Sequence, residues 1–318
     1  MAITLAEAAK LSQNTLQKGV LETFVQTSPL LDRIPFMEIE GNAFAYNEEG
    51  TLPGIEFRAV NGSYTESTGT VNPKTESLVI LGGDADVDTF IQKTRSNFND
   101  QRAVQTAMKV KAASYKYQDT FINGDTAVDA NSFDGLKKRL IGGQVISSPG
   151  ANGSPIFGTN ADTEAFWGAM DDLVSSVPGI DGTNGAIYAN SKVIGKIRSA
   201  GRRAGGVEVV REDLTGKRIV TWNGIPVLDL GTTAAGADIL PMTETKGTSN
   251  LTSSIYAVKF GEDEGDQAVT GLTNGGVDVR DLGEQQVKPA FRTRIEFFCG
   301  VGVFGGKAAA RSTGWLNA

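Results

Sequence analysis

Apolar residues recur at helical spacing through a long stretch without glycine or proline, residues 97–122. The positions that fall near multiples of 3.6 residues, the repeat of one helix face, are Val104, Met108, Tyr115 and Ile122. The stretch predicts one helix, about 39 Å long at 1.5 Å per residue.

Candidate caps stand at both ends of this helix. Asn97 or Asn99 can accept a backbone hydrogen bond at its start, and Gly124 can end it. Between positions 95 and 118 five Lys and Arg residues oppose Asp100, a net charge of +4. We interpret these charges as a solvated helix face rather than a specific phosphate site.

From residue 37 to residue 82 the pattern changes to strand-like runs separated by Gly, Pro and Asn. The runs are AFAYN, IEFRAV and ESLVIL. Residues 38–76 contain seven glutamates against Arg58 and Lys74, a net charge of −5. So long and polar a hairpin has too few apolar residues for its own core, and we expect it to lie on another surface.

The N-terminal segment reads as an amphipathic helix, or two short ones, with apolar residues near four-residue multiples between Leu5 and Phe24. Pro29 and Pro35 then favour extended chain.

Residues 135–285 read as a separate lobe of mixed structure. Its predicted elements are the helices TEAFWGAMDDLVSSV and SKVIGKIRSA (capped by Ser191), the strands GAIYAN and SSIYAVKFG, the hairpin RIVTWNGIPVLDL, and an exposed loop at 231–253. The C-terminal sequence AFRTRIEFFCGVGVFGGKAAAR returns to strands, which we expect to pair beside the long helix.

Two acidic stretches do not fit the pattern of a calcium-binding loop. The loop after the long helix starts at Asp125, but its sixth and twelfth positions are Ala130 and Leu136, where the calcium loop needs Gly and Glu. The second stretch is GGDADVDTFI. A calcium loop that starts at its Asp84 would have Thr89 at the sixth position and Arg95 at the twelfth. We therefore interpret 119–140 as a structural joint.

The second stretch is more consistent with a strand. Asp84, Asp86 and Asp88 would share one solvated face of it, with Ala85 and Val87 on the other.

The glycine pattern at 300–305, GVGVFG, resembles a dinucleotide-binding loop only superficially. That site needs a whole βαβ unit and an acidic residue about 20 positions later. None of the residues after Gly305 is acidic, and Lys307 is followed by Ala308 instead of the Ser or Thr of a P-loop. Glycines at a strand turn are the better interpretation.

Composition narrows the function classes. The 318 residues contain no histidine, which excludes His-dependent nucleophiles, His-ligated zinc and imidazole acid–base chemistry. A net charge of −7 argues against a dedicated nucleic-acid binder. The single cysteine, Cys299, excludes an intrachain disulfide, and neither a signal peptide nor a membrane-spanning run is visible.

The order of the predicted elements resembles the major capsid proteins of tailed bacteriophages, whose Hong Kong 97-type fold is shared by encapsulin shells. The resemblance covers nearly the whole chain. It is carried by the N-terminal arm, the extended hairpin, the long helix ending in DTFINGD, the FDGL sequence that begins the second lobe, WNGIPVLDL followed by IYAVKFGEDEG, and the basic-apolar C-terminal strands.

The resemblance implies an α+β fold with named parts. These are an N-terminal arm (1–36), an E-loop hairpin (37–82), a peripheral domain that contains the long spine helix (83–134 and 286–318) and an axial domain (135–285). The segment 119–140 becomes the joint between the spine helix and the axial domain.

The resemblance further implies a structural protein with no catalytic, cofactor or metal site. It would self-assemble into hexamers and pentamers of an icosahedral head around double-stranded DNA, in the host bacterial cytoplasm, and remain in the virion. Expected partners are a scaffolding protein, a portal, a possible decoration protein and, by weak non-specific contact, the DNA; no membrane is involved. The absence of a long coiled-coil segment before the arm, together with Met1, favours a separate scaffolding protein.

Two alternatives remain open. An encapsulin-type compartment would share the fold but hold protein cargo. A carboxylate-dependent enzyme of α+β fold is formally possible, although the sequence shows no paired catalytic motif.

The hairpin is expected to hold a neighbouring subunit without a covalent bond. The candidate contact residues are Glu48, Glu49, Arg58 and Lys74 on the hairpin, and Lys109, Lys116, Arg292 and Arg294 on the surfaces that could receive it. Some family members form a lysine–asparagine bond here. Lys74 is the hairpin's only lysine, and nothing in the sequence places a catalytic glutamate beside it.

Overall fold

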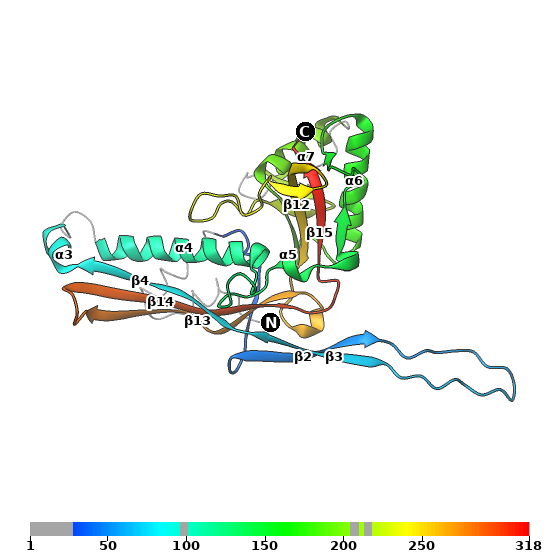
Figure 1. Ribbon diagram of the computed structural model, residues 1–318, viewed down its shortest axis with the longest axis horizontal. Coiled ribbons are helices and arrows are strands. Elements are labelled where there is room, and N and C mark those ends of the chain that lie inside the picture. The colour runs from blue at the N-terminus through cyan, green and yellow to red at the C-terminus, as the bar shows by residue number, and fades with distance from the viewer. Residues whose placement is uncertain (1–27, 96–100, 204–209, 213–217, 318) are drawn as a thin grey trace.

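The protein, described by a computed structural model over residues 28–95, 101–203, 210–212 and 218–317, has three parts. Figure 1 shows a long layer formed by a helix lying on a narrow sheet, a lobe that rises from one end of this layer, and a hairpin that projects away from both. The N-terminal helix prediction falls on residues 1–27, outside the described residues.

The long layer combines chain segments far apart in sequence. Its four-stranded sheet has the order β1-β13-β14-β4, and α3 and α4 follow β4. Its elements are β1 (Phe36–Glu38), β4 (Val79–Asp88), α3 (Thr89–Arg95), α4 (Gln101–Asn123), β13 (Val269–Glu284) and β14 (Ala290–Val303).

One face of this sheet is covered by α4, as the strand alternation predicts. Ala85 and Val87 are buried, as are Ile295 and Phe297 on β14, which pair with Gly83 and Leu81 of β4. The strand prediction for 84–88, with its alternating faces, is confirmed.

The prediction for α4 is correct in its end and only partly correct in its face, because Ile122 is buried but Met108 is not. The helix ends at Asn123, and the Gly124 N–H donates to the carbonyl of Thr120 (2.8 Å). Met108, predicted on the buried face, is 61% exposed. The face that meets the sheet contains Thr106, Val110, Ser114, Tyr117 and Phe121. The predicted caps Asn97 and Asn99 lie outside the described residues.

The lobe is built on a nine-stranded sheet with the path β5-β15-β12-β7-β10-β9-β8, to which β6 and β11 attach at β15 and β12. Its strands are β5 (Val145–Ser147), β6 (Ser154–Pro155), β7 (Gly185–Tyr188), β8 (Val210–Glu212), β9 (Arg218–Trp222), β10 (Ile225–Leu228), β11 (Glu244–Lys246), β12 (Ser249–Lys259) and β15 (Ala309–Leu316). Its helical segments are α5 (Leu136–Arg139), η1 (Gly142–Gln144), α6 (Asn160–Ser175), α7 (Ser191–Arg203) and η2 (Glu264–Asp266).

Two buried clusters cover the two faces of this sheet. On one face, α6 and α7 pack over β-strand residues such as Ile187, Ile255 and Trp315. On the other face, Tyr188 and Tyr256 belong to a cluster that continues into the long layer. The lobe and the layer therefore share one apolar core.

Local predictions in the lobe are mostly confirmed. Both helices form, and Asn223 and Gly224 connect β9 to β10 with positive φ angles of 48° and 80°, as a two-residue hairpin turn requires. The Ser191 cap is wrong: Asn190 caps α7, because its Oδ1 accepts the Lys192 N–H (2.9 Å). The predicted loop 231–253 contains β11 and the start of β12.

The hairpin consists of β2 (Ala43–Thr51) and β3 (Thr70–Ser77), joined by residues 52–69. IEFRAV, predicted as a strand, forms none. It lies beyond the last strand pair and has no third strand to pair with, so its backbone extends without a ladder.

The places where the chain passes from one sheet to the other differ from the predicted domain boundaries. Sequence analysis assigns 269–284 to the second lobe, but β13 pairs with β14 in the long layer. It assigns 309–316 to the layer, but β15 pairs with β12 in the lobe. Both ends of the predicted hairpin, at β1 and β4, also belong to the layer sheet. Adjacent residues do not show which distant strand a segment pairs with. The sequence therefore does not predict that β13 joins the layer sheet and β15 the lobe sheet.

Candidate assembly surfaces

The base of the hairpin is fixed to the long layer by aromatic packing. The Tyr46 ring meets Phe304 edge to face, with 4.9 Å between ring centroids, and Phe44 packs against both. The Tyr46 hydroxyl donates to the carbonyl of Val303 (3.3 Å), and burial raises the pKa of Tyr46 to about 12. A two-stranded hairpin is marginal alone, so this contact defines its direction.

A second anchor joins the hairpin to the joint between α4 and the lobe. Arg139 presents two guanidinium nitrogens to the Glu76 carboxylate, with Nη2 to Oε2 at 2.7 Å, and its Nε donates to the carbonyl of Asp134 (2.6 Å). Both side chains are largely buried, at 18% and 15% exposed. Such a two-pronged pair fixes orientation as well as distance.

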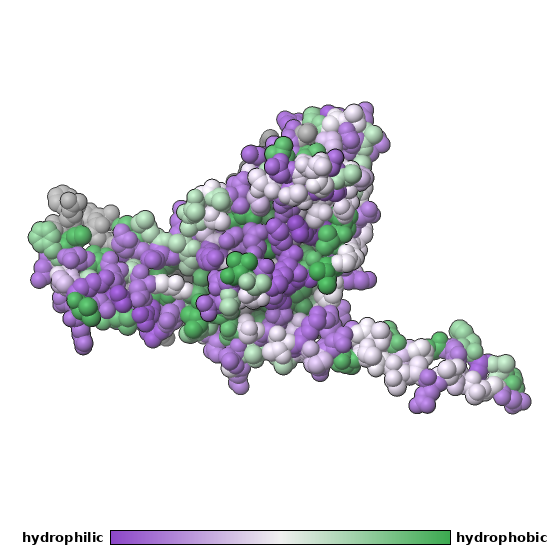
Figure 2. Space-filling view, viewed as in Figure 1, coloured by the Kyte–Doolittle hydropathy of each residue, from purple (hydrophilic) through white to green (hydrophobic). Residues whose placement is uncertain are grey.

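Beyond these anchors, most side chains of the hairpin are exposed to solvent. The large apolar side chains of its connecting segment are Leu52 (78% exposed), Ile55 (96%), Phe57 (106%), Val60 (91%) and Tyr64 (64%). We call these five residues the apolar tip. Figure 2 shows hydrophobic side chains, interspersed with polar ones, at the far end of the projecting arm. Exposed apolar patches of this kind mark surfaces that meet another molecule.

The charged residues predicted on the hairpin make local contacts. Glu48 forms an ion pair with Lys74 across the two strands. Arg58 lies over the Tyr64 ring (5.2 Å) and donates to the carbonyl of Gly62 (3.3 Å). Glu49 is exposed. Their role between subunits stays a prediction.

The predicted receiving residues lie on two different surfaces of the long layer. Lys109 and Lys116 are exposed on α4. Arg292 and Arg294 lie on β14, on the sheet face that α4 leaves uncovered. These four residues therefore cannot form one receiving surface within a subunit.

Arg292 and Arg294 are already paired within the chain. Arg292 holds Asp86 through Nε (2.7 Å) and Nη2 (2.8 Å), and Arg294 holds Asp84 through Nε (2.8 Å) and Nη2 (3.0 Å). Hydrogen bonds from these guanidinium groups lower the pKa of each carboxyl. The solvated acidic face predicted at 84–88 is in fact an ion-pair ladder, because β4 and β14 place opposite charges side by side.

The joint contains an internal cation. The Lys138 Nζ donates to Asp125 Oδ1 (2.7 Å), Thr126 Oγ1 (3.0 Å) and Asp134 Oδ1 (2.9 Å). Among the residues that the structure describes, no cluster of three metal-ligating side chains is present. Three side-chain oxygens of the joint converge on the Lys138 ammonium.

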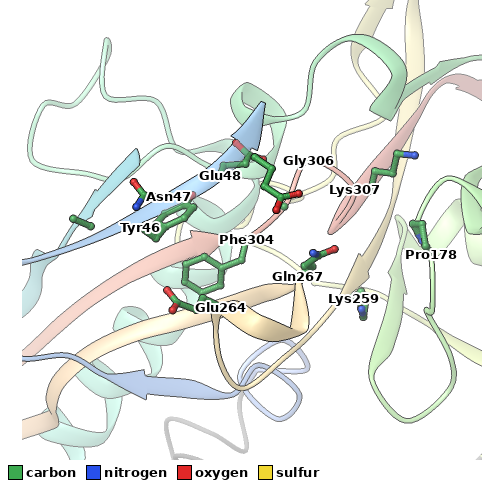
Figure 3. Close-up of a pocket in the computed structure, with 13 residues that line it drawn as sticks. Tyr46, Asn47, Glu48, Pro178, Lys259, Glu264, Gln267, Phe304, Gly306 and Lys307 are labelled. Atoms are coloured by element: carbon green, nitrogen blue, oxygen red, sulfur yellow. The ribbon is translucent and has the colours of Figure 1, made fainter. Parts of the chain in front are cut away.

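A groove of about 740 Å³ separates the hairpin base from the lobe. Figure 3 shows Glu48 and Tyr46 on one side, Lys259 and Pro178 on the other, and Lys307 at the rim. Its charges are of both signs and come from separate elements. Cys299 does not reach it: that thiol is buried, and burial raises its pKa.

None of the helices in the described ranges has the length and apolar character needed to cross a bilayer.

Comparison with known proteins gives one sequence match and many structural ones. Residues 12–153 match the family model described as major capsid protein GP7. No curated protein matches the chain.

Three solved structures illustrate the structural likeness. The SrpI encapsulin of Synechococcus elongatus PCC 7942 is 19% identical, with a TM-score of 0.67 over 98% of this chain and 95% of that one. The capsid of a native GTA particle is 16% identical, with a TM-score of 0.61 over 90% of each chain. The Mycobacterium phage Bobi structure is 13% identical, with a TM-score of 0.58 over 98% of each.

Proposed function

We propose that this chain, which has the Hong Kong 97-type fold of major capsid proteins, is the subunit of a tailed-bacteriophage head. Copies of the chain form the hexamers and pentamers of an icosahedral shell around double-stranded DNA. Proteins of this fold act by assembling, not by catalysis. Assembly takes place in the host bacterial cytoplasm, with a scaffolding protein and a portal as partners, and the finished shell is part of the virion. A decoration protein is a further possible partner, bound to the outside of the shell.

The observation that carries this proposal is the hairpin. Its base is fixed by Tyr46, Phe304 and the Arg139–Glu76 pair, while its apolar tip contacts nothing that would bury it. Burying apolar surface is worth about 25 cal/mol per Å². In a shell, every subunit has a second copy of the chain beside it. The surface of that copy can bury the apolar tip.

The parts of the chain take family roles within this proposal. The hairpin, residues 43–77, is the E-loop that straps a neighbouring subunit, and α4 is the spine helix. The long layer is the peripheral domain and the lobe is the axial domain that surrounds the centre of each capsomer. The contact residues predicted from sequence remain candidates for the strap.

A second candidate has support of its own. The SrpI encapsulin matches over nearly its whole length, with the highest TM-score of the three structures above. In that case the shell would be a protein compartment, and its content would be protein instead of DNA. The subunit contacts proposed here apply to both.

The test is assembly of the full chain, with and without a co-expressed scaffolding protein, followed by electron microscopy. The matched variants are Ile55→Ser with Phe57→Ser in the apolar tip, and Val128→Ser with Val287→Ser elsewhere. All four side chains are at least 86% exposed, so neither pair should alter folding. We expect shells from the wild type and the control, and none from the tip variant.

Shells from the tip variant would contradict the strap. A wild-type chain that stays monomeric with scaffold present would contradict the shell function itself. Nucleic acid in the purified shells supports the phage head, and a specific protein content supports the compartment.

A further inference from the structure

Two helices of the lobe carry opposite charge. α6 contains four acidic residues and no basic one, whereas α7 contains five basic residues and no acidic one. Both pack on the same face of the lobe sheet through one apolar cluster. In Figure 1 α6 runs along the outer edge of the lobe and α7 lies nearer its upper middle.

The acidic charges of α6 form an outward stripe. Its exposed positions include Glu164, Gly168, Asp171 and Asp172, which recur at helical spacing opposite the buried Phe166, Met170 and Leu173. We call Glu164, Asp171 and Asp172 the acidic stripe. It is about 12 Å long at 1.5 Å per residue.

The basic charges of α7 form a matching stripe. Its exposed positions include Lys192, Gly195, Arg198 and Arg202, opposite the buried Val193 and Ile197. We call Lys192, Arg198 and Arg202 the basic stripe. Its length, about 15 Å, is close to that of the acidic stripe.

These charges are not used inside the subunit. Within the described part of the chain, none of the six stripe residues forms an ion pair; Asp171 accepts the Trp222 indole N–H (3.0 Å) and Arg202 donates to Ser199 Oγ (3.2 Å). The one basic side chain of α7 that reaches α6 is Arg203, which lies outside the stripe, donates to Thr163 Oγ1 (3.2 Å) and covers the Phe157 ring (3.6 Å).

A glycine stands in the middle of each stripe, and neither is required by the fold. A side chain at Gly168 or Gly195 would meet nothing within 4 Å. Glycine inside an exposed helix costs about 0.5–1 kcal/mol relative to alanine. A close neighbouring surface is a reason to keep both positions small.

We propose that the acidic stripe of one subunit docks on the basic stripe of the next around each ring of the shell. The occupant is a second copy of this chain, as charge complementarity indicates. The inference rests on the proposed shell function and adds which surfaces of the lobe meet.

The charge pattern also bears on the type of contact. A two-fold contact through one stripe alone would place acid against acid or base against base, which repels, so a two-fold contact would have to contain both stripes at once. A head-to-tail contact places acid against base at every interface. Such contacts close into a ring when the rotation between copies allows it.

The test uses charge reversal with a matched control. The acid-reversed chain carries Glu164→Lys and Asp172→Lys, and the base-reversed chain carries Lys192→Glu and Arg198→Glu. A third chain carries all four changes, so its net charge equals that of the wild type. All four side chains are exposed, and equal melting temperatures establish that each variant folds.

Each reversal alone should raise the protein concentration needed for assembly by about tenfold or more, because like charges then face each other. The four-change chain should assemble as the wild type does. In 1 M salt, where charges are screened within about 3 Å, the differences should largely vanish.

Mixing the two reversed chains gives a sharper result. Alternating copies restore every contact in a ring of six, but a ring of five must contain one like-charged contact. An equal mixture should therefore yield six-membered rings in open sheets or tubes, and no closed shells.

Normal assembly of either reversed chain overturns the inference while leaving the shell function standing. So does a folded four-change chain that fails to assemble. A wild type that forms no shells contradicts the proposed function instead, so the two failures are distinguishable.

Discussion

At the scale of single residues, the pairs that hold the molecule together join positions far apart in the chain. Arg139 is the last residue of α5, within the joint, and its partner Glu76 lies at the hairpin base. Arg292 and Asp86 are 206 positions apart. No local pattern indicates such partners.

Replacing Arg139 with methionine should lower the free energy of unfolding by about 1.5–3 kcal/mol, because the Glu76 carboxylate loses charged hydrogen bonds in a largely buried place. Urea unfolding followed by circular dichroism measures this. Lys137→Met is the matched control: its side chain is 45% exposed and its Nζ lies 3.6 Å from Glu244 Oε1, so its loss should cost under about 1 kcal/mol. Equal losses in the two variants would contradict the anchor.

The joint should respond to acid. Burial acts to raise the pKa of Asp134, but hydrogen bonds from Thr126 and Lys138 outweigh it and lower the pKa from 3.8 to about 2. A lowered carboxyl pKa contributes stability that is fully present above the unfolded value and is lost as pH falls through the folded value. The contribution of Asp134 should therefore disappear between about pH 4 and pH 2.

Lys138→Met isolates this effect, since it removes the ammonium shared by Asp125 and Asp134. Unfolding by urea at a series of pH values should show a smaller loss of stability from pH 4 to pH 2 in the variant than in the wild type. Parallel pH curves would show that the lysine does not tune these carboxyl groups.

At the scale of elements, α4 supports the long layer over its whole length. Ala107 lies in its interior and its side chain is exposed, so a substitution there tests the backbone alone. Ala107→Pro should destabilise the protein by about 3 kcal/mol, because proline removes a hydrogen bond and clashes with the preceding turn. Ala107→Ser should cost under about 1 kcal/mol in the same thermal unfolding experiment. If both variants melt alike, the helix is not continuous through this position.

Elements with strong local signals could be predicted from sequence. The turn at Asn223 and Gly224 and the periodicity of α6 are written in adjacent residues. The buried face of α4 could not be predicted, because packing against the sheet buries Thr106 and Ser114 and exposes Met108. The last strand was misplaced for a related reason: β14 and β15 are both apolar, and only pairing assigns β15 to the lobe sheet while β14 stays in the layer, as predicted.

The assembly surfaces were predicted only in part. The excess of glutamates predicts a hairpin without its own core, but the same analysis predicts a strand at 55–60, where the structure has the exposed apolar tip. Ile55 and Phe57 alternate with polar residues as in a strand, and a sequence does not show that no partner strand is beside them. The pairing of Arg292 with Asp86 was invisible because it depends on register.

At the scale of the whole molecule, net charge limits what an unassembled subunit can hold. With −7 overall, the chain should not retain DNA at physiological salt, since non-specific binding depends on neutralising phosphates. Fluorescence anisotropy with a short duplex in 150 mM salt should show no binding at micromolar protein. The base-reversed chain described above tests whether α7 contributes any residual binding. Tight, salt-dependent binding by the wild type would contradict a merely enclosing role.

The interleaving of the two sheets has a consequence for the order of synthesis. β4 is complete at Asp88, but β14, the strand that pairs with it, is made only from Ala290 onward. Roughly 200 residues must be translated in between, which takes about 10–40 s at usual elongation rates. During this time, the hairpin of a nascent chain lacks Phe304, the residue on which its base packs. A chain whose synthesis has not reached β14 and Phe304 cannot yet hold its hairpin in the orientation that a neighbouring subunit would meet.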